Sequence, residues 1–258
     1  MKNAALITGA SSGIGKELAL IHASKKRDLV IVARRAEELE AMKEEIIKKY
    51  GVEVLVLPCD LMQIGAAKKI FDALKEQNIE IHYLFNNAGL GGYGKFYERD
   101  RNKEVDMIQL NIVALTELTH LFLPEMIARN RGKILNTAST AGFIPGPMQS
   151  VYFATKAYVV SFSQGIAQEV STNGISVTAL CPGPVRTEFE KEAGMEGSGL
   201  FKKAATAIST AQKGYSGMEK GKLIVITEYS LRFALNWLLP FAPRKMVMRA
   251  IEKMQTIK

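Results

Sequence analysis

Cysteine is scarce in this 258-residue chain, and the two present, Cys59 and Cys181, lie too far apart in sequence to suggest a metal clip. A disulfide-stapled secreted fold would need more cysteines, so a reducing compartment fits better. The three histidines are scattered without ligand spacing, so no metal site is expected. No apolar run reaches the roughly 18 residues of a membrane span, and the apolar run near the N-terminus is too short for a signal peptide. We therefore expect a cytoplasmic protein that at most contacts a membrane surface.

Acidic residues are outnumbered, with 26 Asp and Glu against 34 Lys and Arg, for a formal net charge of +8. The segment from Leu231 to Lys258 contains six basic residues and one acidic residue, so it supplies +5 of that charge. Elsewhere, no block of Lys and Arg is interleaved with aromatic residues. Nucleic acid is therefore not an expected partner.

What the sequence does contain is a regular alternation of two kinds of segment. Short β-rich runs predict strands at 4–8, 29–33, 52–57, 82–86, 133–137 and 176–180. Apolar residues at helical spacing predict helices at 14–25, 37–50, 66–77, 101–129 and 152–172. Almost continuously apolar strands joined by helices indicate a parallel sheet covered on both faces. The predicted fold class is therefore α/β, a doubly wound parallel sheet of about seven strands (Rossmann fold).

A seventh strand is predicted at 222–226, after a turn-rich segment at 214–221. No internal repeat or low-complexity linker is present, so we expect residues 1–258 to form a single domain. Within it, we expect a substrate-loop region at 186–215 and a C-terminal helical extension at 228–258.

Ligands of such a sheet bind outside the carboxyl ends of its strands. The first strand is followed by Thr8-Gly9-Ala10-Ser11-Ser12-Gly13-Ile14-Gly15. Gly9 permits a tight turn, Gly13 lets the backbone approach a pyrophosphate, and Gly15 lets the next helix pack closely on the strand. The free N–H groups and dipole of that helix attract an anion. The spacing differs from the usual dinucleotide fingerprint, but its place between a strand and a helix favours a dinucleotide site.

The second strand ends in Ala33-Arg34-Arg35, with no carboxylate before Glu37. In enzymes that prefer NAD, an acid at this point accepts hydrogen bonds from the ribose hydroxyls, whereas arginine suits the 2′-phosphate of NADP. A charge-assisted bond of roughly 1.5 to 3 kcal/mol would favour NADP(H) over NAD(H) by tenfold or more. The alternative is that Arg34 and Arg35 are solvated residues at a helix start.

Two further strand ends offer cofactor contacts. Asp60 follows the third strand and can accept a hydrogen bond from an adenine amine, or cap the next helix. Asn86-Asn87-Ala88-Gly89 follows the fourth strand, where small residues let an adenosine lie against the backbone, although the tetrapeptide is also an ordinary turn signal.

Residues suited to chemistry lie later in the chain. Ser139 closes the fifth strand, and Tyr152 and Lys156 share one helical face with Cβ atoms about 5 to 6 Å apart. An isolated phenol has a pKa of about 10, which the nearby ammonium and a cationic nicotinamide ring would lower. Ser139 could hold a substrate oxygen beside that phenol.

These motifs together resemble the short-chain dehydrogenase/reductase family over residues 4–190. The resemblance implies that Tyr152 is the catalytic acid/base, that Ser139 orients a carbonyl, and that Lys156 tunes Tyr152 and binds the nicotinamide ribose. It also implies that Asn111 holds a proton-relay water at a kink in its helix. The other cofactor contacts that it implies are Gly9, Ser11, Ser12, Gly13, Ile14, Gly15, Asn87, Ala88, Gly89, Pro182, Gly183, Val185 and Thr187.

The C-terminal part departs from the branch of this family that reduces acyl-carrier-protein substrates. That branch usually ends in a strand followed by paired glycines, whereas this chain has Ile224-Val225-Ile226-Thr227-Glu228-Tyr229. The ending looks more like reductases with an extra C-terminal helical segment. Apolar residues of the strand-end loops suit an apolar carbonyl substrate, or merely pack those loops. They are Leu90, Tyr93, Phe96, Phe143, Ile144, Met148, Phe189, Met195, Leu200 and Phe201.

The leading hypothesis is an NADPH-dependent reductase of a hydrophobic ketone or aldehyde, working reversibly. The alternative is a catalytically silent NADP(H)-sensing module, against which the joint presence of Asn111, Ser139, Tyr152 and Lys156 argues. A sugar-nucleotide epimerase or dehydratase would normally need a larger C-terminal substrate domain than the chain after Pro182 provides.

The C-terminal segment is apolar from Leu231 to Leu239, is interrupted by Pro240 and Pro243, and resumes a helical pattern at 245–254. So much apolar surface should be covered. The family resemblance favours a homodimer or homotetramer, built chiefly from the helices predicted at 101–129 and 152–172. An anionic membrane surface is the second choice, and the third is that the segment folds back over its own substrate pocket.

Overall fold

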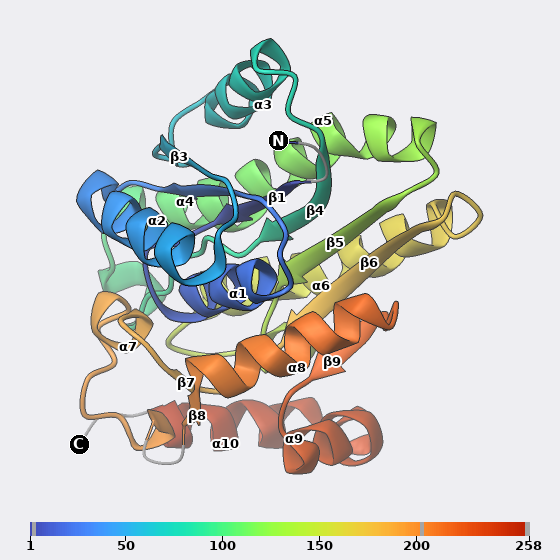
Figure 1. Cartoon of the computed structure of the whole chain (residues 1–258). Coiled ribbons are helices and arrows are strands. Elements are labelled where there is room, and N and C mark those ends of the chain that lie inside the picture. Colours follow the sequence, from blue (N-terminus) through green and yellow to red (C-terminus); the bar gives the residue numbers. More distant parts are fainter. Residues whose placement is uncertain (2–3, 202–203, 256–258) are drawn as a thin grey trace.

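The computed structural model describes residues 1, 4–201 and 204–255 (Figure 1). Seven parallel strands form the main sheet in the order β3-β2-β1-β4-β5-β6-β9, which confirms the predicted doubly wound α/β fold. The strands are β1 (Ala4–Thr8), β2 (Leu29–Ala33), β3 (Val54–Pro58), β4 (Ile81–Asn86), β5 (Gly132–Thr137), β6 (Ile175–Cys181) and β9 (Ile224–Ile226). The strand order reverses between β1 and β4, and this is where such sheets form a ligand crevice.

Helices cover both faces of this sheet (Figure 1). One face carries α1 (Gly13–Ser24), α2 (Ala36–Tyr50) and α8 (Ala207–Glu219). The other carries α3 (Ala66–Glu76), α5 (Leu115–Ala128) and α6 (Ser150–Glu169). Successive strand residues alternate between the two cores, with Leu6 in one and Ile7 in the other. This double burial explains why the strands are almost continuously apolar.

The prediction of a turn-rich segment at 214–221 is wrong, because α8 continues to Glu219. Gly214 and Gly217 are packing residues of this helix. A Cβ on Gly214 would lie 2.7 Å from the Leu180 side chain, and one on Gly217 would collide with Val225. Since α8 begins at Ala207, residues 207–215 of the predicted substrate-loop region are also helical.

The helix predicted at 101–129 is interrupted at its centre. It consists of α4 (Arg101–Ile108), a π-helical turn (Gln109–Ala114) that contains Asn111, and α5. The whole stretch is long and apolar enough to cross a membrane. However, its buried side chains Leu118, Phe122 and Met126 pack in the core against the sheet.

The remaining elements lie beyond the carboxyl ends of the strands or at the β9 edge. Short elements after β4 and β5 are η1 (Phe96–Glu98) and η3 (Thr140–Phe143). Those after β6 are β7 (Val185–Arg186), α7 (Phe189–Glu192), η4 (Gly199–Phe201) and β8 (Ala205–Thr206). After β9 follow α9 (Tyr229–Phe233), the π-helical η5 (Ala234–Leu238), η6 (Leu239–Phe241) and α10 (Arg244–Gln255). The helical pattern predicted at 245–254 is confirmed as α10, while residues 256–258 lie outside the described part of the chain.

Candidate active site

A cavity of about 600 Å³ lies outside the carboxyl ends of the strands. Its lining runs from Arg34 and Arg35 after β2, past the glycine-rich turn after β1, to Tyr152 on α6 and on to the C-terminal helices. All the predicted catalytic and cofactor-contacting residues line it except Gly15 and Asn111. The volume is typical of a small-molecule site.

The glycine-rich turn is shaped by close approaches. Gly9 has φ +65°, and a Cβ there would lie 2.9 Å from Cα of Ala88 after β4. Gly13 has φ +54°, and a Cβ there would lie 3.0 Å from the Thr187 methyl group. Gly15 lies behind the turn, where a Cβ would collide with the Gly9 carbonyl oxygen. These contacts leave no room for side chains, so the glycines allow the turn after β1 to approach the loops after β4 and β7 closely.

Thr8 shapes the crevice, although the sequence reasoning gave it no role. Its Oγ1 donates to the Phe85 carbonyl oxygen at 3.2 Å and accepts from the backbone N–H groups of Asn87 and Ala88 at 2.9 and 3.0 Å. The Asn87 amide donates back to the Thr8 carbonyl oxygen at 3.1 Å. Thr8 therefore fixes the two strand ends on either side of the crevice.

The start of α1 and the end of β2 offer hydrogen-bond donors to a dinucleotide. The first turn of α1 contains no acidic residue, and its N-cap, Ser12, makes no side-chain capping bond. Arg34 is exposed beside it, and Arg35 donates to the Ser11 hydroxyl at 3.1 Å. The positive end of the helix and the two guanidinium groups form a donor set that fits a pyrophosphate and a 2′-phosphate.

An ion pair crosses this part of the crevice. Nη2 of Arg35 lies 2.9 Å from Oε2 of Glu188, in the loop after β7. Hydrogen bonding from Arg35, and then from Ser12, lowers the pKa of the Glu188 carboxyl group. Glu188 therefore pairs with Arg35, one of the two arginines that the sequence analysis assigns to the 2′-phosphate of NADP.

Asp60 lines the cavity, but the predicted capping role is wrong. Its Oδ1 accepts from the Met62 N–H at 3.1 Å, and its Oδ2 accepts from the Gln63 side chain at 3.1 Å. The N-cap of α3 is Gly65, with φ +78°. Asp60 closes a local turn instead, and this turn holds its carboxylate at the cavity wall.

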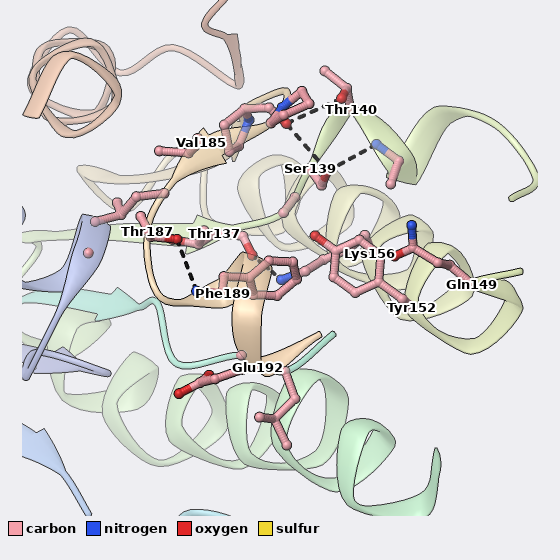
Figure 2. Close-up of a pocket in the computed structure, with 18 of the residues that line it drawn as sticks. Thr137, Ser139, Thr140, Gln149, Tyr152, Lys156, Val185, Thr187, Phe189 and Glu192 are labelled. Atoms are coloured by element: carbon pink, nitrogen blue, oxygen red, sulfur yellow. Dashed lines mark hydrogen bonds between the residues drawn. The ribbon is translucent and has the colours of Figure 1, made fainter. Parts of the chain in front are cut away.

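The structure brings Ser139, Tyr152 and Lys156 together on one wall of the cavity (Figure 2). Ser139 Oγ donates to the Pro182 carbonyl oxygen at 3.3 Å and accepts from the Ala141 N–H at 3.1 Å. The Lys156 ammonium donates to the Thr137 carbonyl oxygen at 2.8 Å and lies 5.8 Å from the centre of the Tyr152 ring. Tyr152 and Lys156 project from adjacent turns of α6, as their spacing predicts.

Burial controls the protonation of this group. It raises the pKa of Tyr152 to about 12, against a lowering by the hydrogen bond with Ser139. It also lowers the pKa of Lys156 to about 8. The desolvation of the phenolate dominates, so the pKa of Tyr152 lies above its ordinary value in this arrangement. Lowering of that pKa by Lys156 together with a nicotinamide ring stays a prediction.

Asn111 lies behind the cavity wall rather than in it. Its Oδ1 accepts from the Leu90 N–H at 2.8 Å, and its Nδ2 donates to the Leu90 carbonyl oxygen at 2.9 Å and to Thr155 Oγ1 at 3.0 Å. The π-helical turn is the predicted local kink, and it directs this amide toward α6. Asn111 thereby ties the loop after β4 to the turn of α6 between Tyr152 and Lys156.

The substrate end of the cavity has two sources of apolar side chains. Of the predicted lining residues, the cavity contacts Leu90, Ile144, Phe189, Met195, Leu200 and Phe201, but not Tyr93, Phe96, Phe143 or Met148. The C-terminal helices add Leu231, Ala234, Leu235, Leu239, Val247, Ala250, Ile251 and Met254. The inner side of the C-terminal segment therefore folds back over its own cavity, the arrangement that the sequence analysis ranked third.

One residue anchors the C-terminal helices to the catalytic wall. Oε2 of Glu228 accepts from the Gly183 N–H at 2.9 Å and from the Thr227 hydroxyl at 2.7 Å. The preceding residue, Pro182, accepts the hydrogen bond of Ser139. The sequence carried no local signal for this contact, because its partners are 45 residues apart.

Comparisons with known proteins agree with this site. A family model described as short chain dehydrogenase matches residues 3–196. The very-long-chain 3-oxoacyl-CoA reductase of Anas platyrhynchos is 36% identical over 193 residues, which cover 72% of this chain and 61% of that protein. The NADP-dependent 3-hydroxy acid dehydrogenase of Schizosaccharomyces pombe is 36% identical over 186 residues, covering 71% of this chain and 72% of that protein.

A solved structure extends the match to almost the whole chain. The short-chain dehydrogenase of Sphingobium yanoikuyae in complex with NADPH aligns with a TM-score of 0.83 and 32% identity, covering 94% of this chain and 97% of that chain. The sequence match to the Anas platyrhynchos reductase, by contrast, spans about three fifths of that protein's length. This chain belongs to the short-chain dehydrogenase family of oxidoreductases.

Proposed function

We propose that this protein is an NADPH-dependent reductase of an apolar ketone or aldehyde. The observation that carries the proposal is the single cavity that joins an arginine-bearing dinucleotide crevice to Tyr152 and to an apolar wall. The NADPH-bound neighbour and the NADP-dependent relative support the choice of coenzyme. Reductases of 3-oxoacyl-CoA compounds among the relatives support a substrate with a long apolar part.

The proposed reaction uses Tyr152 as the proton donor. When bound, NADPH supplies a hydride to the carbonyl carbon. The phenol of Tyr152 gives its proton to the carbonyl oxygen, so that the substrate leaves as an alcohol. A pKa of about 12 keeps this phenol protonated at neutral pH, which suits the direction of reduction.

Other residues of the wall position the substrate and the coenzyme. The Ser139 hydroxyl can exchange its bond to Pro182 for one to the substrate oxygen, since the present bond is long at 3.3 Å. Lys156, which lines the cavity, would hold the nicotinamide ribose, and it supplies a positive charge below about pH 8. Asn111 ties the loop after β4 to the turn of α6 that precedes this lysine.

The test is NADPH oxidation measured over aliphatic, aromatic, steroid and acyl-thioester ketones, with NADH in parallel. We expect oxidation of NADPH by ketones with long apolar chains and slower oxidation of NADH. Tight NADPH binding without turnover of any carbonyl compound would instead favour the NADP(H)-sensing module.

A homodimer through the outer faces of α4, α5 and α6 is part of the proposal. Val105 and Ile108 on α4 are 50% and 40% exposed, which is consistent with an apolar contact there. Sedimentation of the purified protein tests this, with a monomer mass as the contrary result. A cytoplasmic location also stays a prediction.

A further inference from the structure

The C-terminal helices are apolar on two sides. Their inner side lines the cavity, while six large exposed side chains do not line it, and we call these six the outer tail surface. These are Tyr229, Phe233, Trp237, Leu238, Phe241 and Met246. Tyr229 and Phe241 are each 84% exposed, and Trp237 is 67% exposed. Such a concentration of aromatic side chains in water marks an interaction surface.

The outer tail surface is also strongly basic. Arg232, Arg244, Lys245, Arg249 and Lys253 are exposed along α9 and α10, and Glu252 is the one acidic residue between Tyr229 and Gln255. Five positive charges and one negative charge leave an excess of +4 in this segment. Arg232 lines a surface hollow together with Tyr229, Phe233 and Trp237.

Two occupants would cover the apolar side chains, and the charge distinguishes them. In a twofold dimer the same patch meets itself, so the five cations of one copy would face those of the other. An anionic lipid surface instead attracts each of them, by about 1 kcal/mol per Lys or Arg near the surface. Trp and Tyr are the residues that favour the boundary between lipid and water, where the ring is buried and its polar atom stays hydrated.

We propose that the outer tail surface binds an anionic lipid surface, with its aromatic side chains at the level of the headgroups. The helices α9 to α10 then lie in the plane of the interface, as short amphipathic segments do. Binding is electrostatic at long range and apolar at contact, so it weakens with salt. The proposal concerns a surface outside the catalytic wall and does not depend on the reductase activity.

The position of the cavity suggests that the lipid contact serves substrate entry, and this step rests on the proposed function. Met254 is 54% exposed and also lines the cavity, so the cavity reaches the surface beside α10. Ala250 on the same helix is exposed and lines it as well. An apolar substrate dissolved in the bilayer would then reach the cavity with little exposure to water.

The test uses Trp237, the only tryptophan in the chain. The full-length protein is titrated with phosphatidylcholine vesicles that contain or lack phosphatidylserine, and tryptophan emission and cosedimentation are recorded. We expect a blue shift and cosedimentation with the phosphatidylserine vesicles, both reduced by salt. Equal binding to both vesicle types, or none, would overturn the proposal.

Two pairs of variants separate charge from apolar contact. Arg244→Gln with Lys245→Gln should weaken vesicle binding roughly 25-fold, about fivefold for each charge removed. Tyr229→Ser with Phe241→Ser should abolish the blue shift, and both side chains are too exposed to matter for folding. Thermal unfolding of each variant checks that the fold is intact.

Matched changes elsewhere serve as controls. Lys48→Gln with Lys49→Gln removes the same charge from exposed positions on α2, at the opposite edge of the sheet. Ile64→Ser with Tyr97→Ser removes two apolar side chains that are 92% and 77% exposed. Loss of binding in either control pair as large as in its partner pair would contradict the proposal. So would a concentration-dependent doubling of mass, without lipid, that Tyr229→Ser with Phe241→Ser abolishes, because the occupant would then be a second copy.

Discussion

Two tyrosines with raised phenol pKa values lie on opposite sides of the sheet and have different surroundings. Tyr215 on α8 has a hydroxyl 3.0 Å from Nδ1 of His22 and accepts from Arg27 at 2.9 Å, and Arg27 also pairs with Glu219 at 2.5 Å. Tyr152 on α6 instead lines a cavity beside Ser139 and Lys156. Burial is the main cause of the raised pKa in both.

The two tyrosines differ in the hydrogen-bond partners of their hydroxyl groups. The Tyr215 hydroxyl is engaged by neighbours that join α1 to α8, so it contributes to stability. Tyr152 is hydrogen-bonded with Ser139 and lines the cavity, where a ligand oxygen can take a hydrogen bond from it. Residue type and burial alone therefore do not distinguish a structural tyrosine from a catalytic one, whereas access to the cavity does.

The largest expected effect is a loss of turnover that distinguishes Tyr152 from Tyr215. Tyr152→Phe should lower turnover by two or more orders of magnitude while NADPH binding and thermal stability persist, because the variant lacks only the acid. Tyr215→Phe should retain turnover and lose roughly 1 to 3 kcal/mol of unfolding free energy, because it leaves His22 and Arg27 short of a partner. Steady-state kinetics and denaturant unfolding of both variants check this, and the reverse assignment of effects would refute it.

The cluster of Tyr215, His22 and Arg27 should also make the free energy of unfolding depend on pH. Burial lowers the pKa of His22 to about 3, below its ordinary value of 6.5, so the unfolded chain binds a proton that the folded chain does not. The free energy of unfolding should therefore fall as the pH drops through 6.5, by about 2 kcal/mol from this group between pH 7 and 5. His22→Gln should remove that part of the pH dependence.

The control for this measurement is His120→Gln, at an exposed position on α5. It should leave the pH dependence of unfolding as in the parent protein. An unchanged pH dependence in His22→Gln would show that other groups cause it.

Fold and site differ in how far the sequence predicts them. The strands follow from apolar runs, because each is buried on both faces, and the observed strands differ from the predicted ranges by at most two residues. Local motifs likewise located the turn at Gly9 and the pair Tyr152 and Lys156. The prediction of a turn at Gly214 failed because it depends on tertiary packing. Gly214 is a packing residue rather than a turn residue, and the close packing of α8 on β6 explains why it is glycine.

Several site residues could not be identified from local patterns. The cavity wall formed by Leu235 and Ile251 depends on where the C-terminal helices dock, which periodicity does not specify. Asn86, the first residue of the predicted cofactor motif, does not line the cavity, and its buried amide instead donates to Asn136 at 2.9 Å and so links β4 to β5. A polar residue at the end of an apolar strand was the one available signal for this link.

The preference for NADPH over NADH tests the role of Arg34 and Arg35 in the dinucleotide crevice. Replacing Arg34 and Arg35 by Ala should weaken NADPH binding tenfold or more and leave NADH binding nearly unchanged, because only NADPH has the 2′-phosphate. Fluorescence titration with both coenzymes measures this. Equal losses would show that the arginines act elsewhere.

A smaller effect is expected at Glu188, which holds Arg35 at 2.9 Å. Glu188→Gln should strengthen NADPH binding a few-fold and leave NADH binding unchanged, because the carboxylate no longer competes with the 2′-phosphate for the guanidinium group. Glu190→Gln, on the neighbouring helix α7, is the matched control. Weaker NADPH binding in Glu188→Gln would mean that the ion pair assists coenzyme binding instead.

The central claim is that one cavity joins an NADPH site, the Tyr152 acid and an apolar wall made by the chain's own C-terminal helices. The most direct test is kcat/KM for NADPH oxidation along a series of methyl ketones of increasing chain length. Each buried methylene contributes about 0.8 kcal/mol, so kcat/KM should rise about fourfold per methylene until the cavity is filled. A flat series, or no oxidation at any length despite NADPH binding, would contradict the account.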